Sequence, residues 1–113
     1  GLKYLESQGL AEGPPAIVLC SLGDGSVTEG EVAEAFQMAV LHKYPIVYLI
    51  QDNDWGISAT GAEMRAMDAV EFAQGFKGLE ALRISDGARF TECYAVLERA
   101  YATARHERRP VLV

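Results

Sequence analysis

The sequence has little of the material from which cross-links or soft-metal sites are built. It contains only two cysteines, Cys20 and Cys93, which lie far apart and show neither CxxC spacing nor a Cys/His ligand pattern. Each lies in an apolar or helical stretch, so we expect both to be small buried hydrophobes. The fold must therefore be stabilised by an ordinary hydrophobic core.

Basic residues are also scarce: 10 Lys and Arg stand against 16 Asp and Glu, for a formal charge of −6. No basic stripe is present, which argues against a nucleic acid or an anionic membrane surface as partner. The longest apolar runs, residues 16–20 and 45–50, are far shorter than the roughly 20 residues that span a bilayer, and no signal peptide is visible. We expect a soluble, cytoplasmic protein.

Half of the 113 residues are hydrophobic, which is too many for an intrinsically disordered chain and enough for one core. This length allows one domain at most. The first residue is Gly1 rather than Met, and residues 110–113 resemble a strand that is cut short. We therefore predict that residues 1–113 form a single segment of a longer protein.

Apolar runs alternate with helical patterns along the chain. The expected strands are residues 16–22, 46–50, 79–85 and a fourth that begins at Val111. Four helices are expected. Residues 1–9 form the end of the first, which Gly9 caps, and the others run from Thr28 to just before Pro45, over residues 69–76 and over residues 90–104. Short connections in this order are typical of right-handed βαβ crossovers, so we predict an α/β fold with a doubly wound parallel sheet.

Local patterns add detail to these helices. Thr28 with Glu31, and Asp68 with Glu71, have the spacing of capping boxes. In the helix that follows Thr28, eight positions predict burial over much of the circumference: Val32, Ala33, Ala35, Phe36, Met38, Ala39, Val40 and Leu41. In the last helix the expected apolar stripe is Phe90, Tyr94, Leu97, Tyr101 and Ala104.

Ligands of such sheets bind beyond the carboxyl ends of the strands, here residues 23–28, 51–58 and 85–89. The turn over residues 23–26 lets amides approach an anion just before a helix. Asp24 and Asn53 offer hard oxygen ligands for Mg²⁺ or Ca²⁺, and they would meet at one ion if their strands are neighbours. The turn alone is weak evidence, because it lacks GxGxxG spacing and a P-loop lysine, and a plain turn capped by Asp24 is an alternative.

The sequence Gly23-Asp24-Gly25, a spacer of 27 residues and then Asn53 resembles the thiamine diphosphate motif. The surrounding sequence is similar to the α part of the thiamine diphosphate-dependent 2-oxo acid dehydrogenases. The similar segments are residues 23–31, 34–36, 51–58, 73–79, 85–87 and 109–113. These are the decarboxylating components of the pyruvate and branched-chain complexes. The resemblance implies part of a thiamine diphosphate-binding fold. It also implies oxidative decarboxylation of pyruvate or a branched-chain 2-oxo acid such as 2-oxoisovalerate, with transfer of the acyl group to a lipoyl carrier.

The resemblance also implies roles for individual residues. The cofactor-binding residues would be Gly23, Asp24, Gly25, Ser26, Gln51, Asn53 and Ile57, the last near the aminopyrimidine. Mg²⁺ would be held by Asp24, by the side chain of Asn53 and by the backbone carbonyl of Trp55. No catalytic group is expected in this segment, because the activating glutamate comes from a β part and the histidines lie elsewhere. Expected partners are that β part, separate or fused, and a lipoyl-bearing acyltransferase, within an oligomer.

Some residues depart from the family pattern or allow two interpretations. Asp52 replaces the first Asn of a usual pair, Trp55 replaces a common Tyr, and Gln51 is neutral where the branched-chain enzymes often carry Arg. Glu31 and Glu34 match acids of the family's channel between cofactors. A capping box explains Glu31 equally well, whereas for Glu34 the channel role is favoured over a solvated helix position, because its helix is otherwise mostly apolar. The alternatives are a transketolase-like or acetolactate synthase-like enzyme and a non-catalytic flavodoxin-like domain.

Overall fold

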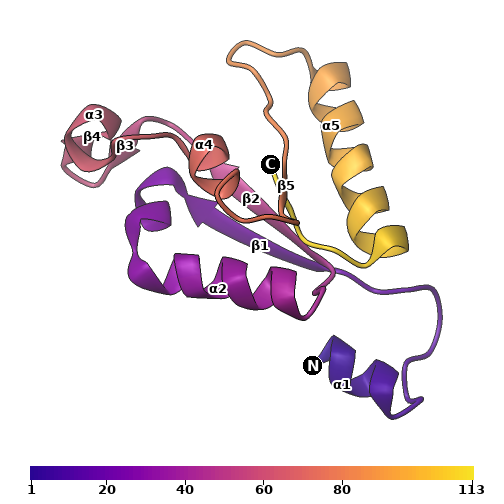
Figure 1. The fold of residues 1–113 in the computed structure, drawn as a ribbon. Coiled ribbons are helices and arrows are strands. Elements are labelled where there is room, and N and C mark those ends of the chain that lie inside the picture. The colour runs from indigo at the N-terminus through magenta and orange to yellow at the C-terminus, as the bar shows by residue number, and fades with distance from the viewer.

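A computed structural model describes residues 1–113 and contains a four-stranded parallel sheet in the order β1-β2-β6-β5 (Figure 1). The strands are β1 (Val18–Gly23), β2 (Ile46–Gln51), β5 (Glu80–Ala81) and β6 (Val111–Leu112). Each neighbouring pair runs parallel. The predicted α/β fold is confirmed. The third strand is shorter than predicted, because β5 pairs only with the two-residue β6 and residues beyond Leu82 have no ladder to join.

Helices cover both faces of the sheet. Helices α2 (Gly30–Leu41) and α4 (Ala69–Ala73) pack on one face, and α5 (Phe90–Ala102), continued by the π-helical turn η2 (Thr103–Glu107), packs on the other (Figure 1). The two cores use alternate residues of the same strands, since successive side chains point to opposite faces. Tyr48 and Leu112 lie in the α2 core, while Val47 and Val111 lie in the α5 core. The sheet is therefore doubly wound.

Phe36 of α2 is the centre of the first core. It is fully buried, and its ring packs edge-to-face on Tyr48 at 4.8 Å and on Phe76 at 5.4 Å between centroids. Burial raises the pKa of Tyr48 to about 12, and the Tyr48 hydroxyl donates a hydrogen bond of 3.4 Å to the Ala35 carbonyl oxygen. This aromatic cluster fixes α2, and with it the loop that precedes α2, against β2.

The two long helices bury less than their patterns predicted. In α2 only Phe36 and Ala39 are buried, whereas Met38 is 46% and Leu41 72% exposed, because the helix contacts the sheet along one side only. In α5 the contacts with the sheet come from its C-terminal half. Phe90 and Tyr94, at its start, are 80% and 58% exposed. The prediction that α2 is buried over much of its circumference is wrong, and the apolar stripe of α5 is covered only toward its C-terminal end.

One predicted capping box forms and one does not. The Glu71 amide donates to Asp68 Oδ1 and the Asp68 amide donates to Glu71 Oε2, both at 2.9 Å, so α4 begins as predicted, although it ends at Ala73. Residues Asp24–Thr28 instead form a 3-10 helix, η1, in which the Thr28 hydroxyl donates to the Gly25 carbonyl at 2.8 Å. Helix α2 consequently begins one residue later, with Glu29 as its N-cap and no side-chain cap.

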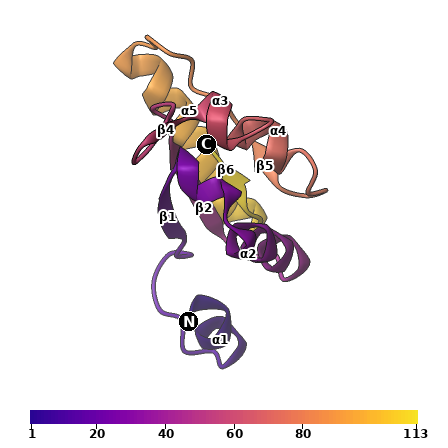
Figure 2. The same ribbon diagram turned by 90° about the vertical axis from the view of Figure 1, so that its left-hand side faces the viewer.

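The N-terminal helix α1 (Leu2–Ser7) lies apart from the sheet in both views (Figures 1 and 2). Gly9 follows it with φ of +68°, as the predicted cap requires. Arg108 joins this segment to the body through an ion pair with Glu6 and a hydrogen bond to the Ala16 carbonyl. Both cysteines are free and half-buried rather than fully buried. No helix of the structure is long and apolar enough to cross a membrane.

Candidate functional site

The candidate site lies where β1 and β2 end. The two strands pair in parallel over six residues, and Gly23, the last residue of β1, lies opposite Gln51, the last residue of β2. The expectation that these strands are neighbours is confirmed. Because parallel strands deliver their carboxyl ends to one edge, Asp24 and the residues after Gln51 leave the sheet side by side.

A short hairpin and helix complete this edge. Strands β3 (Trp55–Gly56) and β4 (Ala59–Thr60) pair antiparallel, and α3 (Gly61–Met64) follows directly. The sequence analysis did not predict these elements, yet a signal was present at Thr60 and Glu63, which have capping spacing. The Thr60 amide and hydroxyl both donate to Glu63 Oε2 at 2.8 Å. These bonds, the backbone one first, lower the pKa of Glu63.

Two glycines let this hairpin lie directly on η1. A Cβ on Gly25 would lie 3.4 Å from the Cα of Gly56, and a Cβ on Gly56 would lie 2.4 Å from Sδ of Met64. Gly25 therefore serves the packing of two loops against each other, in addition to the approach of an anion that its sequence context predicts. The turn 23–28, the hairpin and α3 form one unit.

Arg65, which caps the C-terminal end of α3, is the residue that sequence reasoning missed. Its Nη1 lies 3.1 Å from Asp24 Oδ2, and its Nη2 lies 3.0 Å from Asp52 Oδ1 and 3.2 Å from Asp54 Oδ1. The Arg65 side chain is 12% exposed and that of Asp24 2%. Three carboxylates in two adjoining loops were the signal that a cation must lie between them. We call this group of four side chains the Arg65 cluster.

The charges of the Arg65 cluster affect one another. Burial alone would raise the pKa of Asp52, but hydrogen bonds from Arg65 and from the Asp54 amide outweigh it and leave that pKa below its usual value. The hydrogen bond to Asp52 raises the pKa of Arg65. One guanidinium against three carboxylates leaves two negative charges uncompensated. The edge thus attracts cations in addition to Arg65.

The other predicted site residues lie at the same edge, and the side chains of Gln51 and Asn53 form local hydrogen bonds there. Gln51 Nε2 donates to Ser21 Oγ at 3.2 Å, and Asn53 Oδ1 accepts from the Trp55 amide at 3.0 Å. Trp55 is 57% exposed and Ile57 fully so. Gly23 and Ser26 are exposed, and Gly25 is half-buried. Only Asp24 among the predicted residues is buried.

The donors present fit a hard divalent cation that a phosphate ligand completes. Asp24 Oδ2 is buried and has no hydrogen-bond partner, since Arg65 Nη1 is close but is not aligned with it. Asn53 Oδ1 keeps a second lone pair. No group of three or more His, Cys, Asp or Glu side chains is arranged to hold a metal. Mg²⁺ is usually bound by one or two protein oxygens together with substrate phosphates, and the Asp24 carboxylate and the Asn53 amide oxygen are donors of that kind.

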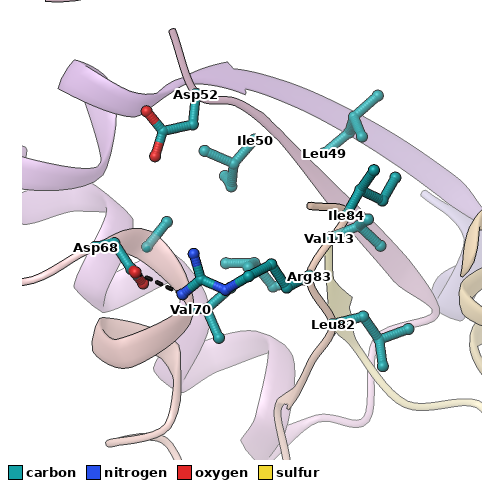
Figure 3. A pocket seen from close by; sticks show the side chains of 11 residues that line it. Leu49, Ile50, Asp52, Asp68, Val70, Leu82, Arg83, Ile84 and Val113 are labelled. Carbon is teal, nitrogen blue, oxygen red and sulfur yellow. Dashed lines mark hydrogen bonds and ion pairs between the residues drawn. The ribbon is translucent and has the colours of Figure 1, made fainter. Parts of the chain in front are cut away.

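A small apolar cavity of about 110 Å³ adjoins this edge (Figure 3). Leu82, Ile84 and Val113 contribute to its wall, and Asp52 reaches it from β2. Arg83 forms an ion pair with Asp68 at its rim, drawn as a dashed line in Figure 3. Asp52 is thus shared between this cavity and the Arg65 cluster.

Comparison with known proteins places the chain in a family. The model of the dehydrogenase E1 component family matches residues 7–113. The chain is 33% identical over 98 residues to the 3-methyl-2-oxobutanoate dehydrogenase subunit alpha of Mycobacterium tuberculosis, covering 87% of this chain and 26% of that protein. It is 32% identical over 114 residues to the pyruvate dehydrogenase E1 component subunit alpha of Rickettsia felis, covering 100% of this chain and 33% of that protein. The chain therefore spans about a quarter to a third of the length of these relatives, and it belongs to the dehydrogenase E1 component family.

Proposed function

We propose that this chain is the part of a thiamine diphosphate-dependent 2-oxo acid dehydrogenase that anchors the cofactor's diphosphate through Mg²⁺. The observation that carries the proposal is the buried Asp24 carboxylate, which directly follows β1, lies beside the loop that follows β2, and has an oxygen without a hydrogen-bond partner. The family match over residues 7–113 supports this function over the transketolase-like, acetolactate synthase-like and flavodoxin-like alternatives.

In this proposal Asp24, the Asn53 side chain and the Trp55 carbonyl hold Mg²⁺. The amides of Gly25 and Ser26, with Gly23 and Gln51 beside them, receive the diphosphate, and Ile57 lies toward the aminopyrimidine. Hard oxygen donors and amides near the start of α2 suit a metal-bound diphosphate. For Asn53 to ligate the metal it uses the lone pair that the Trp55 amide leaves free.

Bound thiamine diphosphate supplies the carbanion chemistry of decarboxylation. This chain's residues hold the cofactor's diphosphate end and fix its position against the sheet. The groups that handle protons at the substrate come from elsewhere in the complete enzyme, so the segment by itself is inactive. The expected partners are a β part, separate or fused, and a lipoyl-bearing acyltransferase, in a cytoplasmic oligomer.

Two substrate classes fit the relatives equally well. One relative is named for 3-methyl-2-oxobutanoate and the other for pyruvate, and their identities to this chain differ by one percentage point. We propose a 2-oxo acid of one of these two kinds as the substrate. The diphosphate anchor described above does not distinguish them, because it contacts only the cofactor.

Isothermal titration of the complete protein with thiamine diphosphate, with and without Mg²⁺, tests the proposal. Asp24→Ala and Asn53→Ala should abolish Mg²⁺-dependent binding, because water replaces the lost ligand without preorganisation. Asp86→Ala is the matched control, since Asp86 is an exposed aspartate in the loop between β5 and α5 and forms no ion pair. Trp55→Phe should have little effect because its ligand is a main-chain oxygen. Wild-type affinity in both alanine variants would refute the metal assignment.

A further inference from the structure

Arg65 Nη1 lies 3.1 Å from Oδ2 of Asp24, the buried carboxylate that is proposed above to bind Mg²⁺. We propose that Arg65 and Mg²⁺ are alternative partners of the Asp24 carboxylate: the guanidinium neutralises Asp24 before the metal arrives and withdraws when it binds. This inference rests on the proposed function. It makes Arg65 a positioning residue that sets the affinity of the site for Mg²⁺.

Asp24 needs a positive partner whenever the metal is absent. A buried carboxylate without a counter-charge is strongly destabilising, and Arg65 is the basic residue that forms an ion pair with Asp24. Because Arg65 projects from the end of α3, it also ties the hairpin unit to the turn 23–28. The metal-free site is thereby held in shape.

The ion pair between Arg65 and Asp24 lacks hydrogen-bond geometry, which makes it easier for the guanidinium to move away when Mg²⁺ binds. Asp24 Oδ2 and Arg65 Nη1 are 3.1 Å apart, yet both lack a hydrogen-bond partner, so the attraction is electrostatic and not directional. By contrast, Arg65 Nη2 makes true hydrogen bonds to Asp52 and Asp54. The guanidinium is anchored by these two aspartates and only rests against Asp24.

Mg²⁺ and Arg65 exclude each other at Asp24. Mg²⁺ binds carboxylate oxygens at about 2.0–2.1 Å and demands near-octahedral geometry. With Nη1 only 3.1 Å from the same oxygen, two cationic groups would share one buried carboxylate, where their repulsion is weakly screened. The guanidinium must therefore move off Asp24.

The released guanidinium has a place to go. Asp52 and Asp54 have side chains that are 40% and 71% exposed, so Arg65 can follow them toward solvent without losing its hydrogen bonds. Asp52 thereby keeps Arg65 beside the site in both states. The apparent affinity for Mg²⁺ is then the intrinsic affinity reduced by the fraction of molecules in which Arg65 has left Asp24.

The test measures Mg²⁺ affinity of the complete protein by isothermal titration at saturating thiamine diphosphate. Arg65→Gln should bind Mg²⁺ with a dissociation constant about fivefold or more below that of the wild type, because the competing cation is gone. The same variant should unfold at a lower temperature than the wild type when cofactor is absent. Arg65→Lys keeps the charge but cannot bridge three carboxylates, so its dissociation constant should fall about twofold.

Arg83→Gln is the matched control. It removes an arginine that pairs with Asp68 beside Asp52 but makes no contact with Asp24, so Mg²⁺ affinity should not change. If Arg65→Gln fails to fold, the Mg²⁺ affinity of Arg65→Lys tests the proposal alone. Because Lys keeps the positive charge, tighter Mg²⁺ binding in this variant reflects the lost guanidinium contact with Asp24 and not a change in net charge. Unchanged or weaker Mg²⁺ binding in the Arg65 variants, with normal binding in the wild type, would overturn the exchange and leave the proposed function standing. A wild-type protein that binds no cofactor with Mg²⁺ would overturn both.

Discussion

Gly25 and Gly56 face each other across the candidate site, with the Cα of Gly56 only 3.4 Å from the point that a Cβ of Gly25 would occupy. One glycine belongs to the turn after β1 and the other to the hairpin after β2, so their contact sets the distance between the two loops. Met64 of α3 covers the same contact, because its Sδ is 2.4 Å from a Cβ built on Gly56. The loops that would bind the diphosphate are thus positioned by close packing of backbone.

We expect Gly56→Ala to lower the stability of the protein by less than about 1 kcal/mol, because the added methyl would overlap only the end of the Met64 side chain, which is flexible and can adopt another rotamer. The midpoint of thermal unfolding of the complete protein reports this change. Combining it with Met64→Ala removes the overlapping sulfur, so the double variant should lose less stability than the sum of the two single changes. Strict additivity would show that the two side chains do not meet.

Residues 28–31 provide a second prediction. Thr28 is hydrogen-bonded inside η1 and not to α2, so Thr28→Ala should cost about 0.5–1.5 kcal/mol through the lost bond to Gly25. Glu31 is exposed and closes no capping box, so Glu31→Ala should be close to neutral in thermal unfolding. Equal losses in the two variants, with no further loss when they are combined, would indicate a capping box in solution.

The fold could be predicted from sequence where burial on both faces leaves continuous apolar runs. The runs at 16–22 and 46–50 gave β1 and β2 nearly to the residue, and the adjacency of their ends brought Asp24 and Asn53 to one edge. The faces of α2 and α5 could not be predicted in the same way. Periodicity shows which residues are apolar, but the width of the sheet beneath a helix decides how many are covered.

The site could be predicted only in part, for a related reason. Residue types and spacing singled out Asp24 and Asn53 as candidate ligands, and the structure brings their loops to one edge of the sheet, while their binding of a metal stays a prediction. Arg65 itself has no such pattern around it in the sequence, since its position depends on where α3 ends and α3 is four residues long; only the three aspartates indicated that a cation lies between them. The orientation of Asn53 toward the Trp55 amide is likewise a product of local turn geometry. Contacts between short segments that lie far apart in sequence produce no periodic pattern, so they cannot be predicted from the sequence in this way.

A third prediction concerns pH. The amide of Glu71, and then Arg83, hold the pKa of Asp68 below its usual value of about 3.9. A carboxyl whose pKa is lower in the folded state stabilises the protein fully above the unfolded pKa and loses that effect as pH falls through the folded pKa. We therefore expect Asp68→Asn to unfold at a lower temperature than the wild type at pH 7. The difference should shrink below about pH 4.

Asp86→Asn is the control for this pH profile, because Asp86 is exposed and forms no ion pair. Its unfolding temperature should follow that of the wild type at each pH. A difference between Asp68→Asn and the wild type that stays constant from pH 7 to pH 3 would mean that the charge of Asp68 does not stabilise α4.

Ile57 carries the last prediction, because it combines strain with exposure. Its φ is +28°, a region that β-branched residues rarely adopt, and its side chain is fully exposed at the tip of the β3–β4 hairpin. Strain of this kind costs on the order of 1–3 kcal/mol and is typical of functional sites, so an isoleucine there needs a compensating role. Contact with the cofactor is the role proposed above.

Ile57→Gly should therefore raise the unfolding temperature of the cofactor-free protein, because glycine adopts this conformation without steric cost. The same variant should weaken thiamine diphosphate binding in titration, because the apolar contact is lost. Ser58→Gly, in the same two-residue turn, is the matched control and should leave cofactor affinity unchanged. Higher stability with unchanged affinity in Ile57→Gly would place Ile57 outside the cofactor site.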